Sequence, residues 1–269
     1  MPKLSVSQAW DETVAFVTRE TRLLVPLALA LLFLPSVITS LAAPGGRADM
    51  NDSPLNLGLF FLELVVGLVG QIAIARLALG HREPLGTIIG HAARRTPALL
   101  GAAFVVMFPL AMAFGATIGG AGSITRQGSS ANPVAAMLLL LAITLLLVAL
   151  VIVLARFLLT TAAAAVEPGG PLRLLRRAFE LTRGHALRLL GTALLFLIGG
   201  GVAVVAVTSV VGLGATLVLG KPEAWSVAAL VIAVTAAGAQ AVLGTLFTVC
   251  FARLYAQRIA GAEVPSNGI

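Results

Sequence analysis

The chain has 269 residues, of which 59% are hydrophobic and 11% are charged, and its formal net charge is +7. Soluble globular domains carry about 25% charged residues, so this composition excludes an ordinary soluble protein. Because no soluble domain remains to carry a nucleic-acid surface, we attribute the positive charge to membrane topology and to attraction for anionic lipid head groups.

The apolar residues form six long blocks, separated by short polar or Gly/Pro-rich stretches. About 20 consecutive apolar residues are long enough to cross the hydrocarbon core of a bilayer. In lipid the backbone must satisfy its own hydrogen bonds, so each block is predicted to be an α-helix. The blocks are residues 23–43, 55–79, 98–121, 134–166, 186–220 and 224–255. The sequence therefore predicts an all-α polytopic membrane protein with six transmembrane helices.

The basic residues predict the orientation of these helices, since Lys and Arg are concentrated in cytoplasmic loops. With the N-terminus inside, fifteen of the 18 Lys and Arg fall in inner segments, and only Arg47, Arg126 and Lys221 fall in outer loops. Both termini are therefore predicted to be cytoplasmic. The single cysteine, Cys250, can form no intramolecular disulfide, and we expect a bacterial inner membrane.

Apolar residues at steps of three and four precede the first, third and fifth blocks. This spacing predicts amphipathic helices that lie in the cytoplasmic interface of the membrane. The stripes are Val6, Trp10, Val14 and Val17; Leu85, Ile88, Ile89 and Ala92; and Leu172, Leu175 and Phe179.

The same three blocks each contain a residue that weakens a helix: Pro35, Pro109 and Gly199. Proline removes a backbone donor and glycine has low helix propensity, so each is expected to break or kink its helix. Interruptions at corresponding depth are typical of binding sites in transporters.

The even blocks share the motif Ala-Arg-[Leu/Phe], at Arg76, Arg156 and Arg253, where each helix is expected to meet the cytoplasm. Together with the interfacial segments and the breaks, this motif predicts three copies of one unit, related about an axis along the membrane normal. The pseudo-repeats are residues 5–80, 81–167 and 168–260, within a single membrane domain 1–261, and 262–269 is expected to be a disordered tail. Alternatively, Ala-rich helices with flanking arginines look alike by chance.

The segment "PLRLLRRAFELTRGHALRLLG" (171–191) resembles the recurring segment of bacterial six-span proteins of the glycerophosphoryl diester phosphodiesterase membrane domain type. That resemblance implies hydrophobic hairpins that alternate with amphipathic segments. The family takes its name from members with a separate soluble phosphodiesterase domain. His81 and Arg82 are not followed by the Glu-x-Asp of that enzyme, so the resemblance implies the membrane fold and not the activity.

Glu63 is the only acidic residue inside a predicted span. Thirteen residues before Arg76 and Arg253 lie Glu63 and Gln240, and steps of four lead to Gly67 and Gly244 and then to Gln71 and Thr248. Steps of four share one helix face, so we expect the two faces to meet inside the bundle, where small residues allow close approach and polar groups bond across. The candidate polar site is therefore Glu63, Gly67, Gln71, Gln240, Gly244 and Thr248.

Three interpretations of Glu63 remain open. It is a structural acid that hydrogen-bonds Gln240, it lines a cavity for a lipid or other amphiphile, or it relays protons in a transporter. The three motif arginines also have two interpretations. Each obeys the positive-inside rule by itself, or Arg76, Arg156 and Arg253 together bind lipid phosphates with their forked donors.

No known enzyme motif occurs, and the histidines lie in separate cytoplasmic segments, so we predict a non-enzymatic protein without metal or cofactor. The favoured function is binding or transport of a lipid or other amphiphile. The alternative is a structural or accessory subunit that recognises lipid head groups, a protein partner or a second copy of itself. An open cavity beside Glu63 favours the first function, and a direct Glu63–Gln240 contact favours the second.

Overall fold

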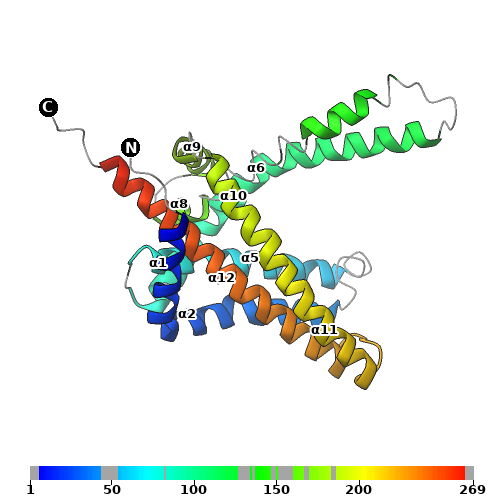
Figure 1. Cartoon of the computed structure of the whole chain (residues 1–269), viewed down its shortest axis with the longest axis horizontal. Coiled ribbons are helices and arrows are strands. Elements are labelled where there is room, and N and C mark those ends of the chain that lie inside the picture. Colours follow the sequence, from blue (N-terminus) through cyan, green and yellow to red (C-terminus); the bar gives the residue numbers. More distant parts are fainter. Residues whose placement is uncertain are drawn as a thin grey trace.

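The computed structural model describes residues 6–43, 54–81, 83–126, 134, 137–146, 150, 160–166, 170–182 and 186–263 (Figure 1). Every secondary-structure element within these ranges is a helix. The predicted all-helical fold class is thus confirmed for the described part of the chain.

The helices follow one another in this order. The first group is α1 (Val6–Arg19), α2 (Thr21–Ala28), the π-helical turn η1 (Leu29–Phe33), α3 (Leu34–Ala42), α5 (Pro54–Ala78) and α6 (Leu85–Arg126). The second group is α8 (Thr160–Val166), α9 (Pro171–Thr182), α10 (Ala186–Leu195), the π-helical turn η3 (Phe196–Gly200), α11 (Gly201–Leu219) and α12 (Val227–Glu263).

The described residues contain five helical stretches that are long and apolar enough to cross a membrane. They are Thr21–Ala42, Pro54–Ala78, Leu85–Thr117, Leu189–Leu219 and Val227–Gln257, and they match five of the six predicted blocks. In the remaining block, 134–166, residues 135–136, 147–149 and 151–159 lie outside the described part, and Met137–Leu146 and α8 are helical pieces of it.

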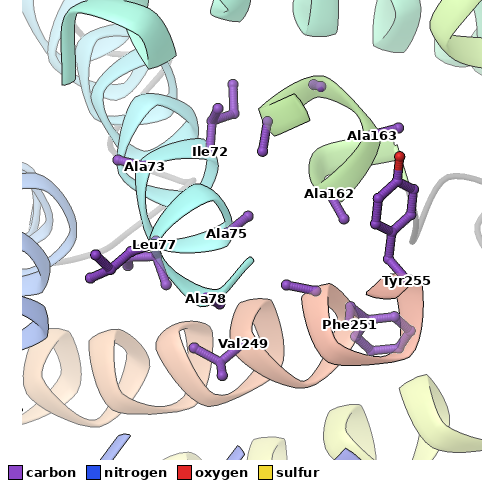
Figure 2. Packing of buried hydrophobic residues seen from close by; sticks show 14 of the residues in the cluster. Ile72, Ala73, Ala75, Leu77, Ala78, Ala162, Ala163, Val249, Phe251 and Tyr255 are labelled. Atoms are coloured by element: carbon purple, nitrogen blue, oxygen red, sulfur yellow. The ribbon is translucent and has the colours of Figure 1, made fainter. Parts of the chain in front are cut away.

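The core lies where the C-terminal halves of α5 and α12 meet α8 (Figure 2). Alanine is the most frequent residue of this core, and its small side chain lets the three helix backbones approach closely. Among its fully buried members are Ile72, Ala73, Ala75, Ala78, Ala162, Ala163, Val249, Phe251 and Tyr255. The two described Ala-Arg motifs therefore belong to the most tightly packed part of the described structure.

Two of the expected helix interruptions coincide with π-helical turns. The turn η1 ends two residues before Pro35, and η3 contains Gly199. No break occurs at Pro109, because α6 continues through both Pro97 and Pro109, and a kink there stays a prediction. A proline removes only its own backbone donor, and long apolar helices tolerate this loss when the neighbouring turns remain hydrogen-bonded.

The amphipathic segments differ from the prediction in two ways. The second one is not a separate helix, because α6 joins residues 85–92 to the span that follows, and its Ile88 and Ala92 are buried in the protein interior. In α1, Trp10 and Val14 are exposed, although the Trp10 ring lies 5.7 Å from the Phe196 ring of η3, and α1 packs on α12 through the buried Ala9 and Thr13.

In α9, Leu174 is buried and Leu172 is exposed. Periodicity thus locates an apolar stripe, but it does not say which neighbouring face another helix covers.

The C-terminal end of the described chain requires one further correction. The helix α12 continues to Glu263 and so includes the start of the predicted tail 262–269; residues 264–269 lie outside the described part. In Figure 1 the distal half of α6 extends away from α1, α2, α5 and α12. Its large side chains Phe104, Phe108 and Met112 are exposed accordingly.

Candidate functional site

A pocket of about 270 Å³ lies between α5, α12 and the η1–α3 segment, in the apolar part of the bundle. Five of the six residues of the predicted polar site line it: Glu63, Gly67, Gln71, Gln240 and Gly244. These residues come from α5 and α12, two helices far apart in the sequence, so the expected meeting of the two polar faces is present in the structure.

Glycines create the space in this pocket. A Cβ atom added at Gly67 or at Gly244 would meet no heavy atom within 4 Å. Each helix therefore lacks a side chain at the level where the two faces meet, and the polar groups of Glu63 and Gln71 border the resulting opening one turn above and below Gly67.

Glu63 and Gln240 border the pocket without touching each other. Among the described residues, no hydrogen bond joins the Glu63 carboxyl group to the Gln240 amide. Glu63 is half-buried, so its carboxyl group faces a cavity and is not closed off by a protein partner. The sequence left two arrangements possible, an open cavity beside Glu63 or a direct Glu63–Gln240 contact. The structure has the open cavity.

Thr248 is not part of this lining, which corrects the predicted set. Its side chain is buried, and its hydroxyl donates a 2.8 Å hydrogen bond to the carbonyl oxygen of Gly244 on its own helix. A threonine in a helix satisfies its hydroxyl in this way without any partner from another helix. Of the predicted set, α12 therefore contributes Gln240 and Gly244 to the pocket, whereas α5 contributes Glu63, Gly67 and Gln71.

The third wall of the pocket comes from residues that the sequence did not single out. Leu32 of η1 and Ser36 of α3 complete the lining, and Ser36 is a buried polar residue. The sequence does contain one signal for Ser36, since it is a small polar residue that directly follows Pro35, where the helix was expected to break.

The π-helical turn η1 fits tightly between the two helices that carry the polar faces. A Cβ atom at Gly70 of α5 would lie 2.9 Å from the Cβ atom of Leu31. On the other side, a Cβ atom at Gly238 of α12 would lie 3.8 Å from the Phe33 ring. π-Helical turns often occur at functional sites, and this one forms the wall of the pocket that holds Glu63.

An apolar pocket of about 280 Å³ lies on the opposite side of the contact between η1 and α12. Ala241 borders both pockets. The threonines in its lining do not make it polar, because the hydroxyl of Thr21 donates to the Val17 carbonyl and that of Thr245 donates to the Ala241 carbonyl, each at 2.7 Å. This second space suits a hydrocarbon chain.

The motif arginines are not equivalent in the structure. The side chain of Arg76 is only 12% exposed, and it donates hydrogen bonds to the carbonyl oxygen of Ala165 at 3.0 Å and to the Glu83 carboxylate at 2.8 Å. Those contacts tie α5 to α8 and to the connection before α6. Arg76 therefore has protein partners where a lipid phosphate was expected.

The other two arginines differ from Arg76. Arg253 has its guanidinium carbon 4.8 Å from the centre of the Phe16 ring and lines a surface pocket. Arg156 lies outside the described residues. A lipid-phosphate role for Arg156 and Arg253 remains a prediction.

Within the described ranges, no three side chains of His, Cys, Asp or Glu come together as a metal site. The polar side chains of the Glu63 pocket are therefore one carboxyl group, two amides and the Ser36 hydroxyl, which can donate and accept hydrogen bonds.

Comparison with known proteins places the chain in a family. No curated protein and no solved structure matches it. One family model, described as a domain of unknown function (DUF7847), matches residues 4–258 and so covers nearly the whole chain. The match does not connect the chain to the glycerophosphoryl diester phosphodiesterase membrane domain, and that resemblance stays an expectation. The chain belongs to the DUF7847 family, whose function is unknown.

Proposed function

We propose that this membrane protein binds a lipid or another amphiphile in the pocket beside Glu63 and carries out no chemical reaction on it. The observation that carries the proposal is the open arrangement of that pocket. Glu63, Gln71 and Gln240 border about 270 Å³ of space, and no bond joins the Glu63 carboxyl group to the Gln240 amide.

The energetics of burial favour a ligand over a purely structural role. A charged side chain costs about 2.5–3.5 kcal/mol at the centre of a membrane helix and less towards the interface, where Glu63 is expected, and acids within a span usually face a partner or a water-filled cavity. A structural acid would recover this cost through a direct hydrogen bond, which Glu63 does not form with Gln240. The polar group of a bound amphiphile would supply the missing interaction.

The apolar pocket on the far side of η1 and α12 supports an amphiphile over a small polar solute. Both spaces border Ala241 and both are lined by the π-helical turn, through Leu32 on one side and Phe33 on the other. A rearrangement of η1 would change the two spaces together, as expected for a protein that transports its ligand.

The finer architecture belongs to the same proposal. We infer six spans in three repeated units, with interfacial amphipathic segments, in a bacterial inner membrane with both termini cytoplasmic. Support comes from the positions of η1 and η3, which lie at the expected interruptions of the first and third units. Both turns also pack against α12.

The alternative function is that of a structural or accessory subunit. It is favoured by the apolar surface of α6, where Phe104, Val105, Phe108 and Met112 are exposed. A protein partner or a second copy of the chain would cover this surface. In that case the Glu63 pocket would have no ligand of its own.

Native mass spectrometry with lipid analysis of the purified protein tests the proposal. Glu63→Gln replaces the carboxyl group by an amide and Gly67→Leu fills the open space, whereas Glu223→Gln and Gly58→Leu make the same changes at exposed positions. We expect one defined lipid on the wild type and on both controls, and an occupancy lower by about tenfold in both pocket variants, because a factor of ten is about 1.4 kcal/mol, which is within the net contribution of one hydrogen bond.

If the bound lipids mirror the bulk membrane in all five proteins, the binding proposal fails and the structural alternative replaces it. Unfolding midpoints measured in the same detergent identify any variant that has lost its fold.

A further inference from the structure

A second polar pocket, of about 270 Å³, lies between α1 and the C-terminal ends of α5 and α12. Four charged side chains line it, and Phe16 and Leu77 form part of its apolar wall. The charged residues are Glu12, Arg19, Glu20 and Arg253. This charged pocket is separate from the Glu63 pocket, with which it shares no residue.

Arg253 is the unusual member of the charged pocket. Its guanidinium group stacks on the Phe16 ring, and its Nε atom is buried without a hydrogen-bond partner. No carboxylate among the described residues lies within ion-pair distance of it. A buried donor without an acceptor is costly, so an anionic group that enters the pocket would gain a charge-assisted hydrogen bond.

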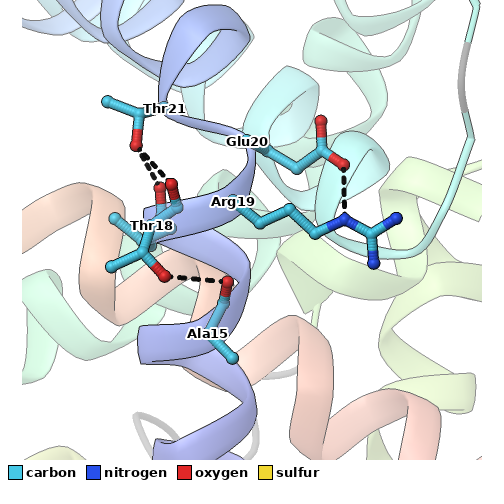
Figure 3. A network of polar contacts seen from close by, with 6 residues as sticks. Ala15, Thr18, Arg19, Glu20 and Thr21 are labelled. Carbon is cyan, nitrogen blue, oxygen red and sulfur yellow. Dashed lines mark hydrogen bonds and ion pairs between the residues drawn. The ribbon is translucent and has the colours of Figure 1, made fainter.

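The carboxylates of the same pocket are held by other partners. The Gln8 side chain donates to the Glu12 carboxylate at 2.9 Å, and Glu20 lies 3.8 Å from the exposed Arg19 guanidinium (Figure 3). The four charged groups add up to no net charge. A plain anion beside Arg253 would therefore meet two carboxylates, and a plain cation would meet two guanidinium groups. A ligand that carries one charge of each sign avoids both conflicts.

The bend between α1 and α2 joins this pocket to the apolar one. Glu20 lies at the bend, where the Thr21 hydroxyl bonds the carbonyl oxygens of Val17 and Thr18 (Figure 3). Phe16 and Glu20 line the charged pocket, while the next residues, Val17 and Thr21, line the apolar pocket of about 280 Å³. A phospholipid has its charged and hydrocarbon parts joined in the same way.

From this geometry we propose that the charged pocket binds the head group of a zwitterionic phospholipid with a primary ammonium group, and that an acyl chain occupies the apolar pocket. The phosphate contacts Arg253, and the ammonium group donates hydrogen bonds to the carboxylates that line the pocket, Glu12 and Glu20.

The primary amine follows from the same residues. A quaternary ammonium group has no N–H to donate, and it is recognised by aromatic faces. The aromatic face available in the lining is that of Phe16, and the Arg253 guanidinium already covers it. An amine with three N–H donors is therefore the better match for the carboxylates.

Competition measured by native mass spectrometry on the full chain tests this assignment. The probes are phospholipids with identical acyl chains and a phosphoethanolamine, phosphocholine or phosphoglycerol head group, together with soluble phosphoethanolamine. The wild type is expected to prefer the phosphoethanolamine lipid by about tenfold, the ratio that one lost hydrogen bond to a charged group produces.

Two variants separate the two halves of the head group. Glu12→Gln should abolish the preference for the primary amine and leave binding of the phosphocholine lipid unchanged. Arg253→Gln should weaken both zwitterionic lipids, and Arg253→Lys should recover part of that loss. Arg173→Gln, which changes an exposed arginine on α9, is the matched control and should behave like the wild type.

Three results would overturn the inference. Preferential binding of the phosphoglycerol lipid would mean that the pocket selects anions. Equal competition by soluble phosphoethanolamine would remove the lipid from the assignment. Loss of head-group preference in Glu63→Gln but not in Glu12→Gln would place this ligand in the Glu63 pocket. By contrast, if Glu63→Gln loses the lipid of the Glu63 pocket but keeps the head-group preference, the assignment of the charged pocket stands.

Discussion

Arg76 illustrates how much a single side chain depends on partners that are distant in the sequence. The Ala-Arg motif fixes where this residue lies on its helix, at the C-terminal end of α5. One of its two acceptors, the carbonyl oxygen of Ala165, is 89 residues away. The motif therefore predicts equal surroundings for Arg76 and Arg253, whereas packing gives one of them two protein acceptors and the other an aromatic ring.

The ion pair between Arg76 and Glu83 makes stability depend on pH. The hydrogen bond from Arg76 holds the pKa of the Glu83 carboxyl group below its usual value of 4.5. A carboxyl group whose pKa is lowered by folding stabilises the protein above its unfolded pKa, and this contribution is lost as the pH falls through the folded pKa. Glu83→Gln should thus be less stable than the wild type at pH 7 and equally stable in strong acid.

Unfolding midpoints between pH 7 and pH 3 measure this difference, with exposed Glu223→Gln as the control. A gap between the wild type and Glu83→Gln that stays constant over this range would contradict the linkage.

At the scale of helices, the contact between α5 and η1 supports the wall of the Glu63 pocket. A Cβ atom at Gly70 would lie 2.9 Å from the Leu31 Cβ atom and 3.2 Å from the Leu32 Cδ2 atom, whereas one at Gly67 would meet nothing within 4 Å. Gly70→Ala should therefore destabilise the protein by about 1–3 kcal/mol through overpacking, and Gly67→Ala should not. Denaturant unfolding in detergent compares the two variants, which lie one turn apart on the same helix. Equal stability would mean that η1 moves aside without cost.

The helices also indicate where sequence reasoning succeeds and where it stops. Composition and block length were sufficient for five spans, and steps of four residues brought Glu63, Gly67 and Gln71 to one pocket, because both signals are local to a helix. The continuity of α6 through its prolines depends on the neighbouring turns. The self-bonded Thr248 and the wall formed by η1 depend on rotamers and on tertiary packing, which no residue spacing encodes.

At the scale of the whole molecule, packing is concentrated at one end. The alanine-rich contact of α5, α8 and α12 includes the C-terminal ends of α5 and α12, while the Glu63 pocket and the apolar pocket lie along the segment from the end of α1 to α3 and along the preceding part of α12. Close packing at one end leaves the helices free to differ in spacing farther along, where these two pockets lie, whereas the charged pocket lies beside the core, against α1.

The proposed six-span topology can be tested with the protein's own cysteine chemistry. Cys250 is buried in the core, so the wild type should react little with a membrane-impermeant maleimide and gives a low background. Exposed positions for single cysteines are Arg19 before the first span, Gly170 before α9, and Glu223 between α11 and α12.

With six spans and a cytoplasmic N-terminus, Glu223→Cys should be labelled on intact cells, while Arg19→Cys and Gly170→Cys should be labelled only after lysis. If block 134–166 does not cross the membrane, every later segment changes sides. Gly170→Cys would then be labelled on intact cells and Glu223→Cys would be protected. The pair of residues thus distinguishes six spans from five, because each crossing reverses the side on which the following loop lies.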